Sequence, residues 1–346
     1  MSTLRRVWRF LGRMGVASSL LFLLLLFSLL GSLLPQLPPS IVGNPARRAT
    51  WLAAARERWG PAIEGLYRWG FLTLSRFPLF VALLVLTALS TLSCTLSRWR
   101  AAWRQAFHRS LRFPAAHLPG SHTVTLPSLP AADLRAALEE RGYRVRAASE
   151  GEVTCLRADR YGLSGLATLV THLAVLLLVV AYGLSGWLGW RAEVAVGPGE
   201  VAAVGRGTGL AVRNDGFTVA HYPDGSVADY RAQVALLAGD RVVAEGVVRV
   251  NGPLRFRGLG VYLMGFRERE GGGVLTLQVV HDPGEGVALA GGLLLLAGVT
   301  ATVYLPHRWV IARLERGQTV LTVRSSGRDD GVEAELTALA RELAGC

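Results

Sequence analysis

The sequence predicts an integral membrane protein with four transmembrane α-helices, a large extracytoplasmic antiparallel β-domain and a small cytoplasmic α+β segment. Hydrophobic residues make up 51% of the 346 residues, and the mean hydropathy is +0.35. Four apolar runs each approach the ~20 residues that a helix needs to cross a bilayer. Between the third and fourth runs, apolar and polar residues alternate in stretches separated by turn residues, which is typical of antiparallel β-structure.

The four apolar runs are predicted to be helices because backbone amides cannot stay unpaired in lipid. They cover residues 16–34, 77–96, 162–188 and 287–305, and the first two belong to an N-terminal segment, residues 1–97, with an extracytoplasmic loop between them. Arginines precede the first run, as they would precede a signal peptide. Its apolar core is longer than a signal core, however, and a proline-rich stretch from Pro35 follows in place of a small-residue cleavage site. We therefore expect the first helix to be retained.

The distribution of arginine predicts the orientation. The sequence contains no lysine, so arginine supplies the basic side of its net charge of +12. Arginines cluster at residues 5–13, 98–112 and 308–316, which all lie on the cytoplasmic side if both termini are cytoplasmic. The bilayer accounts for this charge, and no nucleic-acid partner is expected. The loop at residues 35–76 is also arginine-rich although it must lie outside, and an interfacial amphipathic helix is predicted there from the helical spacing of Trp51, Ala55, Trp59 and Ile63.

Two soluble parts remain between the helices. Residues 98–161 form the cytoplasmic α+β segment, with strands predicted at 123–126, 143–147 and 153–157 and a helix from Pro130 to Gly142. Residues 189–284 form the extracytoplasmic β-domain, where alternation at 217–222, 231–237, 242–250 and 274–280 predicts a sandwich or barrel. No cysteine lies between residues 191 and 282, so this fold does not depend on internal disulfides. Residues 306–346 are expected to be a cytoplasmic tail.

His172 is the leading candidate functional residue. It lies roughly 15 Å along the third apolar run, at about 1.5 Å per helical residue. An ionisable side chain at that depth costs free energy and usually has a function, and neutral imidazole is a strong iron ligand. The alternative is a polar residue bonded to a neighbouring helix, with Thr168 and Thr171 as local polar groups and small residues nearby (Gly162, Gly165 and Ala167) that allow close helix packing.

The other candidates have stronger structural explanations. His307 follows Pro306 at the end of the fourth run, where a helix end and an interfacial anchor explain it better than a ligand role does. Cys155 lies near arginines that would lower the pKa of its thiol, but a half-buried strand position explains it better than a reactive one. The remaining histidines are expected in solvated loops (His108, His117 and His122) or in surface and packing positions of the β-domain (His221 and His281).

Several functions are not supported by the sequence. It has no Cys-x-x-Cys pair, no Walker motif and no Gly-x-Ser-x-Gly or His-Glu-x-x-His motif. No charged residue interrupts the centre of an apolar run, which disfavours ion-coupled transport.

Five short motifs occur in an order that resembles one known family. They are Leu33-Leu-Pro-Gln36, Ser93-Cys-Thr-Leu-Ser-Arg98, Thr171-His172-Leu-Ala, Asn251-Gly-Pro-Leu-Arg-Phe-Arg-Gly258 with Val261-Tyr262, and Tyr304-Leu-Pro-His-Arg308. Each is short, but their order and spacing resemble the ResB family, also called CcsB, of system II cytochrome c biogenesis. The resemblance covers nearly the whole chain and includes the family's layout of three helices, an extracytoplasmic domain and a fourth helix.

The resemblance implies a place in the bacterial cytoplasmic membrane and work with a ResC/CcsA-type membrane protein. The pair would move haem b across the bilayer and present it for covalent attachment to apocytochrome c, as a haem lyase complex, with no activity expected of this chain alone. It also implies that His172 binds the haem iron and that the partner supplies a second histidine. His307 is a weaker haem ligand by this comparison, because Trp309 stands where the family commonly has another basic residue.

Two other functions stay open from the sequence. A non-catalytic scaffold would bind apocytochrome or organise the partner without ligating haem. A membrane sensor would bind an external ligand through the β-domain, but no cytoplasmic output domain is recognisable.

Overall fold

The computed structural model describes residues 2–38, 41–107, 122–150, 153–269, 272–315, 317–325 and 331–344. The chain divides into two compact units. The first unit comprises Met1–Ala17, Ala88–Leu176 and Ala290–Cys346, and the second comprises Ser18–Thr87 and Leu177–Leu289.

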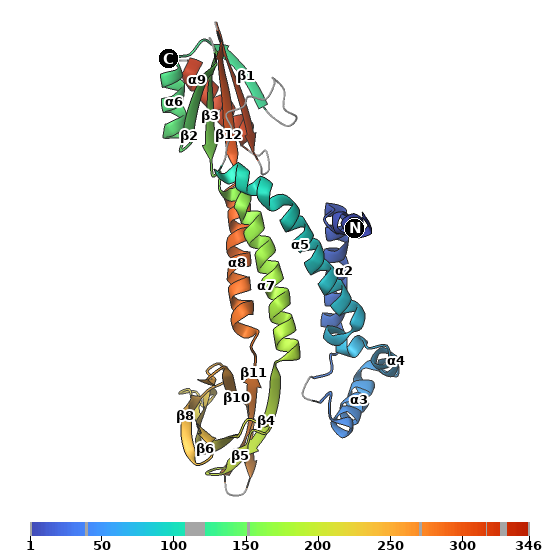
Figure 1. The fold of residues 1–346 in the computed structure, drawn as a ribbon. Coiled ribbons are helices and arrows are strands. Elements are labelled where there is room, and N and C mark those ends of the chain that lie inside the picture. Colours follow the sequence, from blue (N-terminus) through green and yellow to red (C-terminus); the bar gives the residue numbers. More distant parts are fainter. Residues whose placement is uncertain are drawn as a thin grey trace. The chain divides into compact units, whose positions relative to one another are not determined.

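Within the described residues, four helices are long and apolar enough to cross a membrane, as the sequence predicts (Figure 1). They are α2 (Met14–Leu33), α5 (Pro78–Phe107), α7 (Ala167–Trp187) and α8 (Glu285–Tyr304). Their ends lie within a few residues of the predicted ones except at α5, which continues to Phe107. That extension carries Trp99, Trp103 and Phe107 four residues apart, with successive ring centroids 6.5 and 4.5 Å apart.

The N-terminal helix α1 (Ser2–Leu11) is amphipathic and packs on α5 through polar contacts. Its exposed apolar side chains include Leu4 and Phe10. The hydroxyl of Ser93 donates to the carbonyl of Trp8 at 2.8 Å, and that of Ser90 donates to the carbonyl of Leu11 at 2.7 Å. The carbonyl of Trp8 also accepts from the backbone N–H of Gly12 at 3.1 Å, so the two serine bonds add a link between the end of α1 and α5.

The loop between α2 and α5 forms two helices, α3 (Pro45–Trp59) and α4 (Ala62–Arg68), followed by the 3-10 turn η1 (Phe71–Arg76). The sequence predicts one amphipathic helix here, but Gly60 adopts a φ of 78° and ends α3. Ala55 and Ile63 are buried with Leu72, whereas Trp59 stays 48% exposed.

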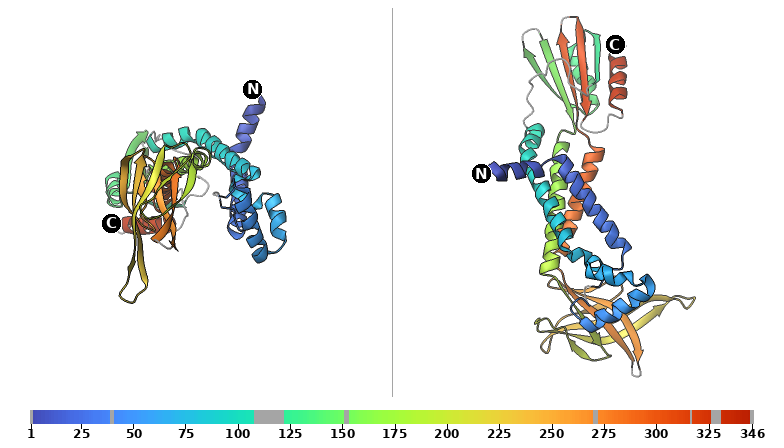
Figure 2. Two further views of the ribbon diagram at one scale, coloured as in Figure 1. Left: turned by 90° about the horizontal axis from the view of Figure 1, so that it is seen from below. Right: turned by 90° about the vertical axis from the view of Figure 1, so that its right-hand side faces the viewer.

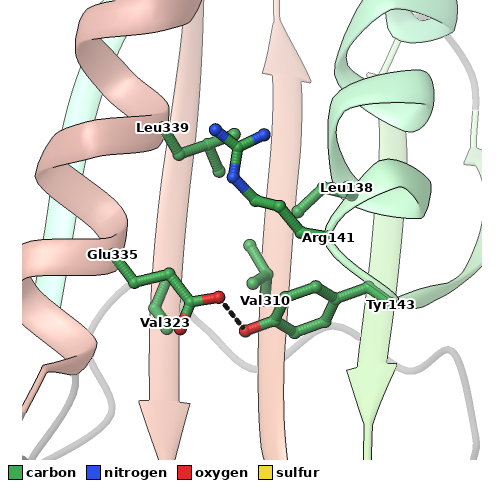
Figure 3. Close-up of a pocket in the computed structure, with 7 residues that line it drawn as sticks. All are labelled: Leu138, Arg141, Tyr143, Val310, Val323, Glu335 and Leu339. Carbon is green, nitrogen blue, oxygen red and sulfur yellow. Dashed lines mark hydrogen bonds between the residues drawn. The ribbon is translucent and has the colours of Figure 1, made fainter.

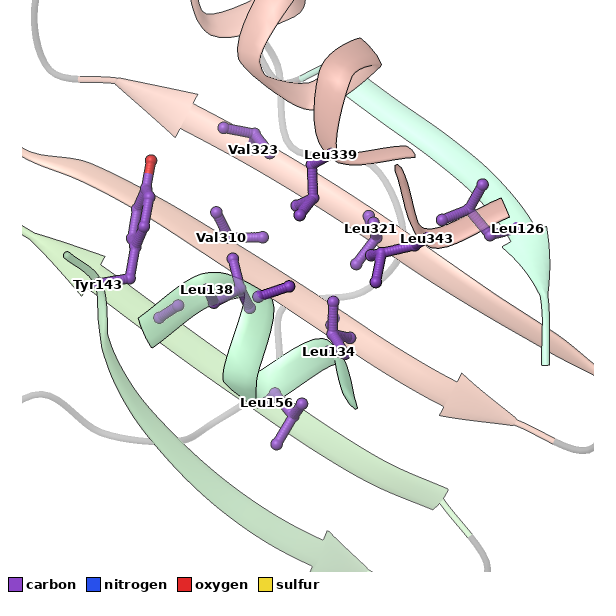
Figure 4. Packing of buried hydrophobic residues seen from close by; sticks show 13 residues of the cluster. Leu126, Leu134, Leu138, Tyr143, Leu156, Val310, Leu321, Val323, Leu339 and Leu343 are labelled. Atoms are coloured by element: carbon purple, nitrogen blue, oxygen red, sulfur yellow. The ribbon is translucent and has the colours of Figure 1, made fainter. Parts of the chain in front are cut away.

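The first unit contains a five-stranded antiparallel sheet with the order β1-β13-β12-β3-β2. Its strands are β1 (His122–Pro127), β2 (Arg144–Glu150), β3 (Val153–Arg160), β12 (Arg308–Glu315) and β13 (Gln318–Ser325). Helices α6 (Ala131–Glu140) and α9 (Val332–Ala344) cover one face of it, as Figure 4 shows. Leu134 and Leu138 of α6 and Leu339 of α9 pack there against alternate strand residues such as Val310 and Leu321.

The expected strands and helix of the α+β segment are therefore present, but they do not form a separate fold. The segment after α8, which we expected to be a tail, supplies β12, β13 and α9. Strand β12 pairs with β3, from Arg308 opposite Arg160 to Leu314 opposite Thr154. The two segments share one hydrophobic core and form one domain.

The second unit contains a sandwich of two four-stranded antiparallel sheets, with the orders β4-β11-β10-β9 and β5-β6-β7-β8. The strands are β4 (Trp190–Val196), β5 (Val201–Ala203), β6 (Leu210–His221), β7 (Val227–Ala238), β8 (Arg241–Val248), β9 (Leu254–Phe256), β10 (Leu259–Arg269) and β11 (Gly272–His281). One core is shared by both sheets, with Val212, Leu236 and Leu277 fully buried. Strands β6 and β7 form a long hairpin whose turn projects from the sandwich (Figure 2).

Candidate functional site

His172 lies on α7 and makes a hydrogen bond to α5. Its Nδ1 atom lies 2.9 Å from Oγ1 of Thr95, and both side chains are partly buried. The same hydroxyl lies 2.7 Å from the backbone carbonyl of Thr91, one turn back in α5. His172 therefore has a partner on a neighbouring helix. The local candidate Thr171 turns its hydroxyl to the carbonyl of Ala167 at 3.0 Å instead.

A charged group accompanies this histidine. Arg98 follows Thr95 by three residues on α5, which is the spacing of neighbours on one helix face. Its guanidinium lies within electrostatic range of the His172 ring. The pair places an imidazole and a fixed positive charge on adjoining helices.

The helix after the sandwich packs closely against α7 beside this site. A Cβ atom on Gly298 of α8 would lie 2.5 Å from Oγ1 of Thr171 and 2.9 Å from its backbone nitrogen. Gly291 and Gly298 are both buried on α8. Of the small residues expected to allow close packing, Ala167 is buried at this contact, and its carbonyl oxygen would lie 3.2 Å from the added Cβ of Gly298. Gly165 precedes α7, and nothing lies within 4 Å of a Cβ added to it. The glycine that permits the approach beside His172 is Gly298 on α8. It follows Gly284 and Gly291 at a seven-residue spacing, which is the signal that would have found it.

His307 occupies a different environment, between α8 and β12. Its Nε2 atom lies 2.9 Å from Oδ1 of Asp159 on β3, whose side chain is 1% exposed. Arg157 contacts the second carboxylate oxygen at 3.2 Å, and the ring of Trp309 lies 4.9 Å from the imidazole. A buried carboxylate needs such partners. The contact gives His307 a structural role that links the end of α8 to the sheet, and a ligand role for it stays a prediction.

The remaining candidates are dispersed. Cys155 is buried on β3, and His122 begins β1, while His108 and His117 lie outside the described residues. His221 is exposed at the end of β6, and Nδ1 of His281 lies 3.2 Å from the carbonyl of Gly258. The part of the chain that the structure describes holds no group of three or more histidine, cysteine or acidic side chains arranged for a metal ion.

A crevice in the first unit is lined in part by Tyr143 and Glu335 (Figure 3). Glu335 also forms an ion pair with Arg308. The hydroxyl of Tyr143 donates to Glu335 at 2.9 Å, and burial together with the nearby carboxylate raises the pKa of Tyr143. The lining is mostly core: Leu138, Tyr143, Val310, Val323 and Leu339 all belong to the buried cluster under α6 and α9. The crevice is thus a feature of domain packing.

Comparison with known proteins identifies the family. Residues 14–276 and 272–338 match the ResB-like family, which is most of the chain. The chain belongs to the ResB-like family. The resemblance read from the five ordered motifs is thereby confirmed.

Individual ResB-like relatives are distant. The cytochrome c biogenesis protein CcsB of Synechococcus sp. (strain JA-3-3Ab) is 27% identical over 226 residues, which cover 58% of this chain and 45% of the relative. The cytochrome c biogenesis protein ResB of Bacillus subtilis (strain 168) is 25% identical over 304 residues, which cover 77% of this chain and 54% of the relative. The chain thus spans about half the length of these relatives.

One solved structure, a cytochrome c haem lyase CcmF, has a TM-score of 0.34 and 13% identity. The match covers 80% of this chain and 38% of that one. A likeness of this size supports no argument about this chain.

Proposed function

We propose that this ResB-like chain is a membrane subunit of a system II cytochrome c synthetase that handles haem and helps to present it to apocytochrome c. Membership of the family supports the process, because the relatives named above are cytochrome c biogenesis proteins. The observation that carries haem handling is His172, an imidazole within an apolar helix whose Nδ1 atom is held by Thr95.

Haem is a substrate in this proposal. His172 would contact the iron through Nε2, since Nδ1 faces Thr95. Arg98 on α5 is a charged candidate for a propionate, because its charge acts on the His172 ring and arginine pairs well with carboxylates. Apolar side chains of the helices would contact the porphyrin ring. A second axial ligand would come from the ResC/CcsA-type partner.

The proposed orientation follows from chain connectivity. Strand β3 precedes α7 and β4 follows it, while β11 precedes α8 and β12 follows it. If both helices span the bilayer, the sandwich and the five-stranded domain lie on opposite sides. The arginine clusters favour a cytoplasmic five-stranded domain and cytoplasmic termini, with the sandwich outside the bacterial cytoplasmic membrane.

A scaffold function is the second candidate, and one observation favours it. The bond from His172 to Thr95 joins α7 to α5, so it also explains a structural histidine. In that case haem would lie entirely in the partner, and the chain would organise the partner or bind apocytochrome through the sandwich.

Absorption spectroscopy of the complex with its ResC/CcsA-type partner separates the two. We expect His172→Ala to lose haem or change its spectrum, and added imidazole to restore the spectrum of His172→Gly. His221→Ala, at an exposed position of the sandwich, is the matched control and should retain the wild-type spectrum. An unchanged spectrum in His172→Ala, with no effect of imidazole and normal cytochrome maturation, would refute haem ligation and favour the scaffold.

A further inference from the structure

We propose that Thr95 is a positioning residue whose hydroxyl fixes the tautomer of His172, so that the lone pair of Nε2 is available to the haem iron. This inference rests on the proposed function for its ligand. Both residues of the contact, Thr95 and His172, belong to the first unit of the chain.

The argument starts from the single hydrogen of the Thr95 hydroxyl. Oγ1 lies 2.7 Å from the carbonyl oxygen of Thr91 and 2.9 Å from Nδ1 of His172. A carbonyl oxygen can only accept a hydrogen bond, so the hydroxyl donates its hydrogen to Thr91. Its oxygen is then left to accept from His172, and the hydrogen of that bond must belong to Nδ1.

The consequence concerns the opposite ring nitrogen. A neutral imidazole with its hydrogen on Nδ1 carries a lone pair on Nε2. Nε2 is then the atom able to bind iron, and the bond to Thr95 also fixes the plane of the ring. Groups that hold the second nitrogen of a ligating histidine commonly set its tautomer and orientation in this way.

His307 provides a contrast within the same unit. There Nε2 itself contacts the buried carboxylate of Asp159 at 2.9 Å. A carboxylate is a strong, charged acceptor, whereas the threonine hydroxyl at His172 is neutral and itself donates to the backbone. A neutral acceptor raises the basicity of an imidazole ligand less than a carboxylate does. A moderately basic ligand suits a substrate that must be bound and then released.

The first test uses the haem-free protein. Full-length chain with ¹⁵N-labelled histidine, in lipid nanodiscs, reports by NMR which ring nitrogen carries the hydrogen, and His172→Gln identifies the resonance. We expect Nδ1–H in the wild type and in Thr95→Ser, and a shift toward Nε2–H in Thr95→Val. Thr302→Val is the matched control, because the Thr302 hydroxyl makes the same bond to the fourth residue back, Gly298, at 2.8 Å.

The second test is titration with hemin, followed by absorption. Loss of a group that positions a metal-binding histidine commonly weakens affinity about 10- to 100-fold, so we expect a loss of that order in Thr95→Val, with affinity retained in Thr95→Ser and Thr302→Val. Hemin binding unaffected by His172→Gln would refute the proposed function while leaving the tautomer measurement valid. An Nε2–H tautomer in the wild type would overturn the role of Thr95. The role of Thr95 would also be overturned if Thr95→Val kept the wild-type tautomer and hemin affinity while His172→Gln weakened hemin binding.

Discussion

Replacing Gly298 by alanine is expected to disrupt the packing of α8 on α7 beside His172. The added Cβ would lie 2.5 Å from Oγ1 of Thr171, 2.9 Å from the backbone nitrogen of Thr171 and 3.2 Å from the carbonyl oxygen of Ala167. The hydroxyl is able to rotate away, but the two backbone atoms move only if the helices separate. Ordinary contact begins at 3.4 Å, so the backbone nitrogen alone requires a shift of about 0.5 Å and the hydroxyl about 0.9 Å.

The expected cost follows from two opposing effects. Overpacking of a close contact costs about 1–3 kcal/mol. Alanine is also a better helix former than glycine by up to about 1 kcal/mol, which stabilises the variant. Gly292→Ala isolates the first effect, because it lies on the same helix and no heavy atom lies within 4 Å of its added Cβ. Gly298→Ala should therefore be less stable than Gly292→Ala by about 1–3 kcal/mol.

The assay is unfolding of the full chain in mixed micelles of mild detergent and SDS, followed by tryptophan fluorescence. We expect a lower SDS midpoint for Gly298→Ala than for Gly292→Ala. Adding Thr171→Ala should restore part of the loss, because it removes the hydroxyl and leaves the two backbone contacts. A Gly298→Ala protein as stable as the Gly292→Ala control would refute the reasoning from close helix packing.

Three further outcomes are expected. Replacing Asp159 by alanine removes the buried carboxylate that His307 contacts and should lower the free energy of unfolding by about 3 kcal/mol. Asp215→Ala, at a more exposed ion pair, should cost under ~1 kcal/mol in the same SDS titration. Tyr143→Phe should lower the free energy of unfolding by about 1 kcal/mol through the lost hydrogen bond. Because the pKa of Tyr143 is raised in the folded state, the stability of the wild type should fall as pH rises above about 10. The same decline at high pH in the Tyr143→Phe variant would contradict this. Ser93→Ala should speed amide hydrogen exchange at the end of α1, while Ser97→Ala, whose hydroxyl bonds within α5, should leave that exchange unchanged.

The sequence by itself determined the four apolar helices and the β-structure of residues 189–284. Both are local signals: a spanning helix requires a continuous apolar run, and a strand buried on one face requires alternation. The sequence also determined the family, because its motifs keep their order, and it singled out His172 through the cost of an ionisable group in an apolar run.

Only the tertiary structure decided which distant segments meet. Strand β12 pairs with β3 in one sheet, although β12 follows α8 in the sequence. The sequence did not indicate this pairing, because strands so far apart leave no local pattern. Asp159 reaches His307 across 148 positions, and Thr95 reaches His172 across 77. A hydrogen bond depends on where two side chains lie in space, so the sequence indicated which histidine was unusual, and the fold decided which of its nitrogens is held.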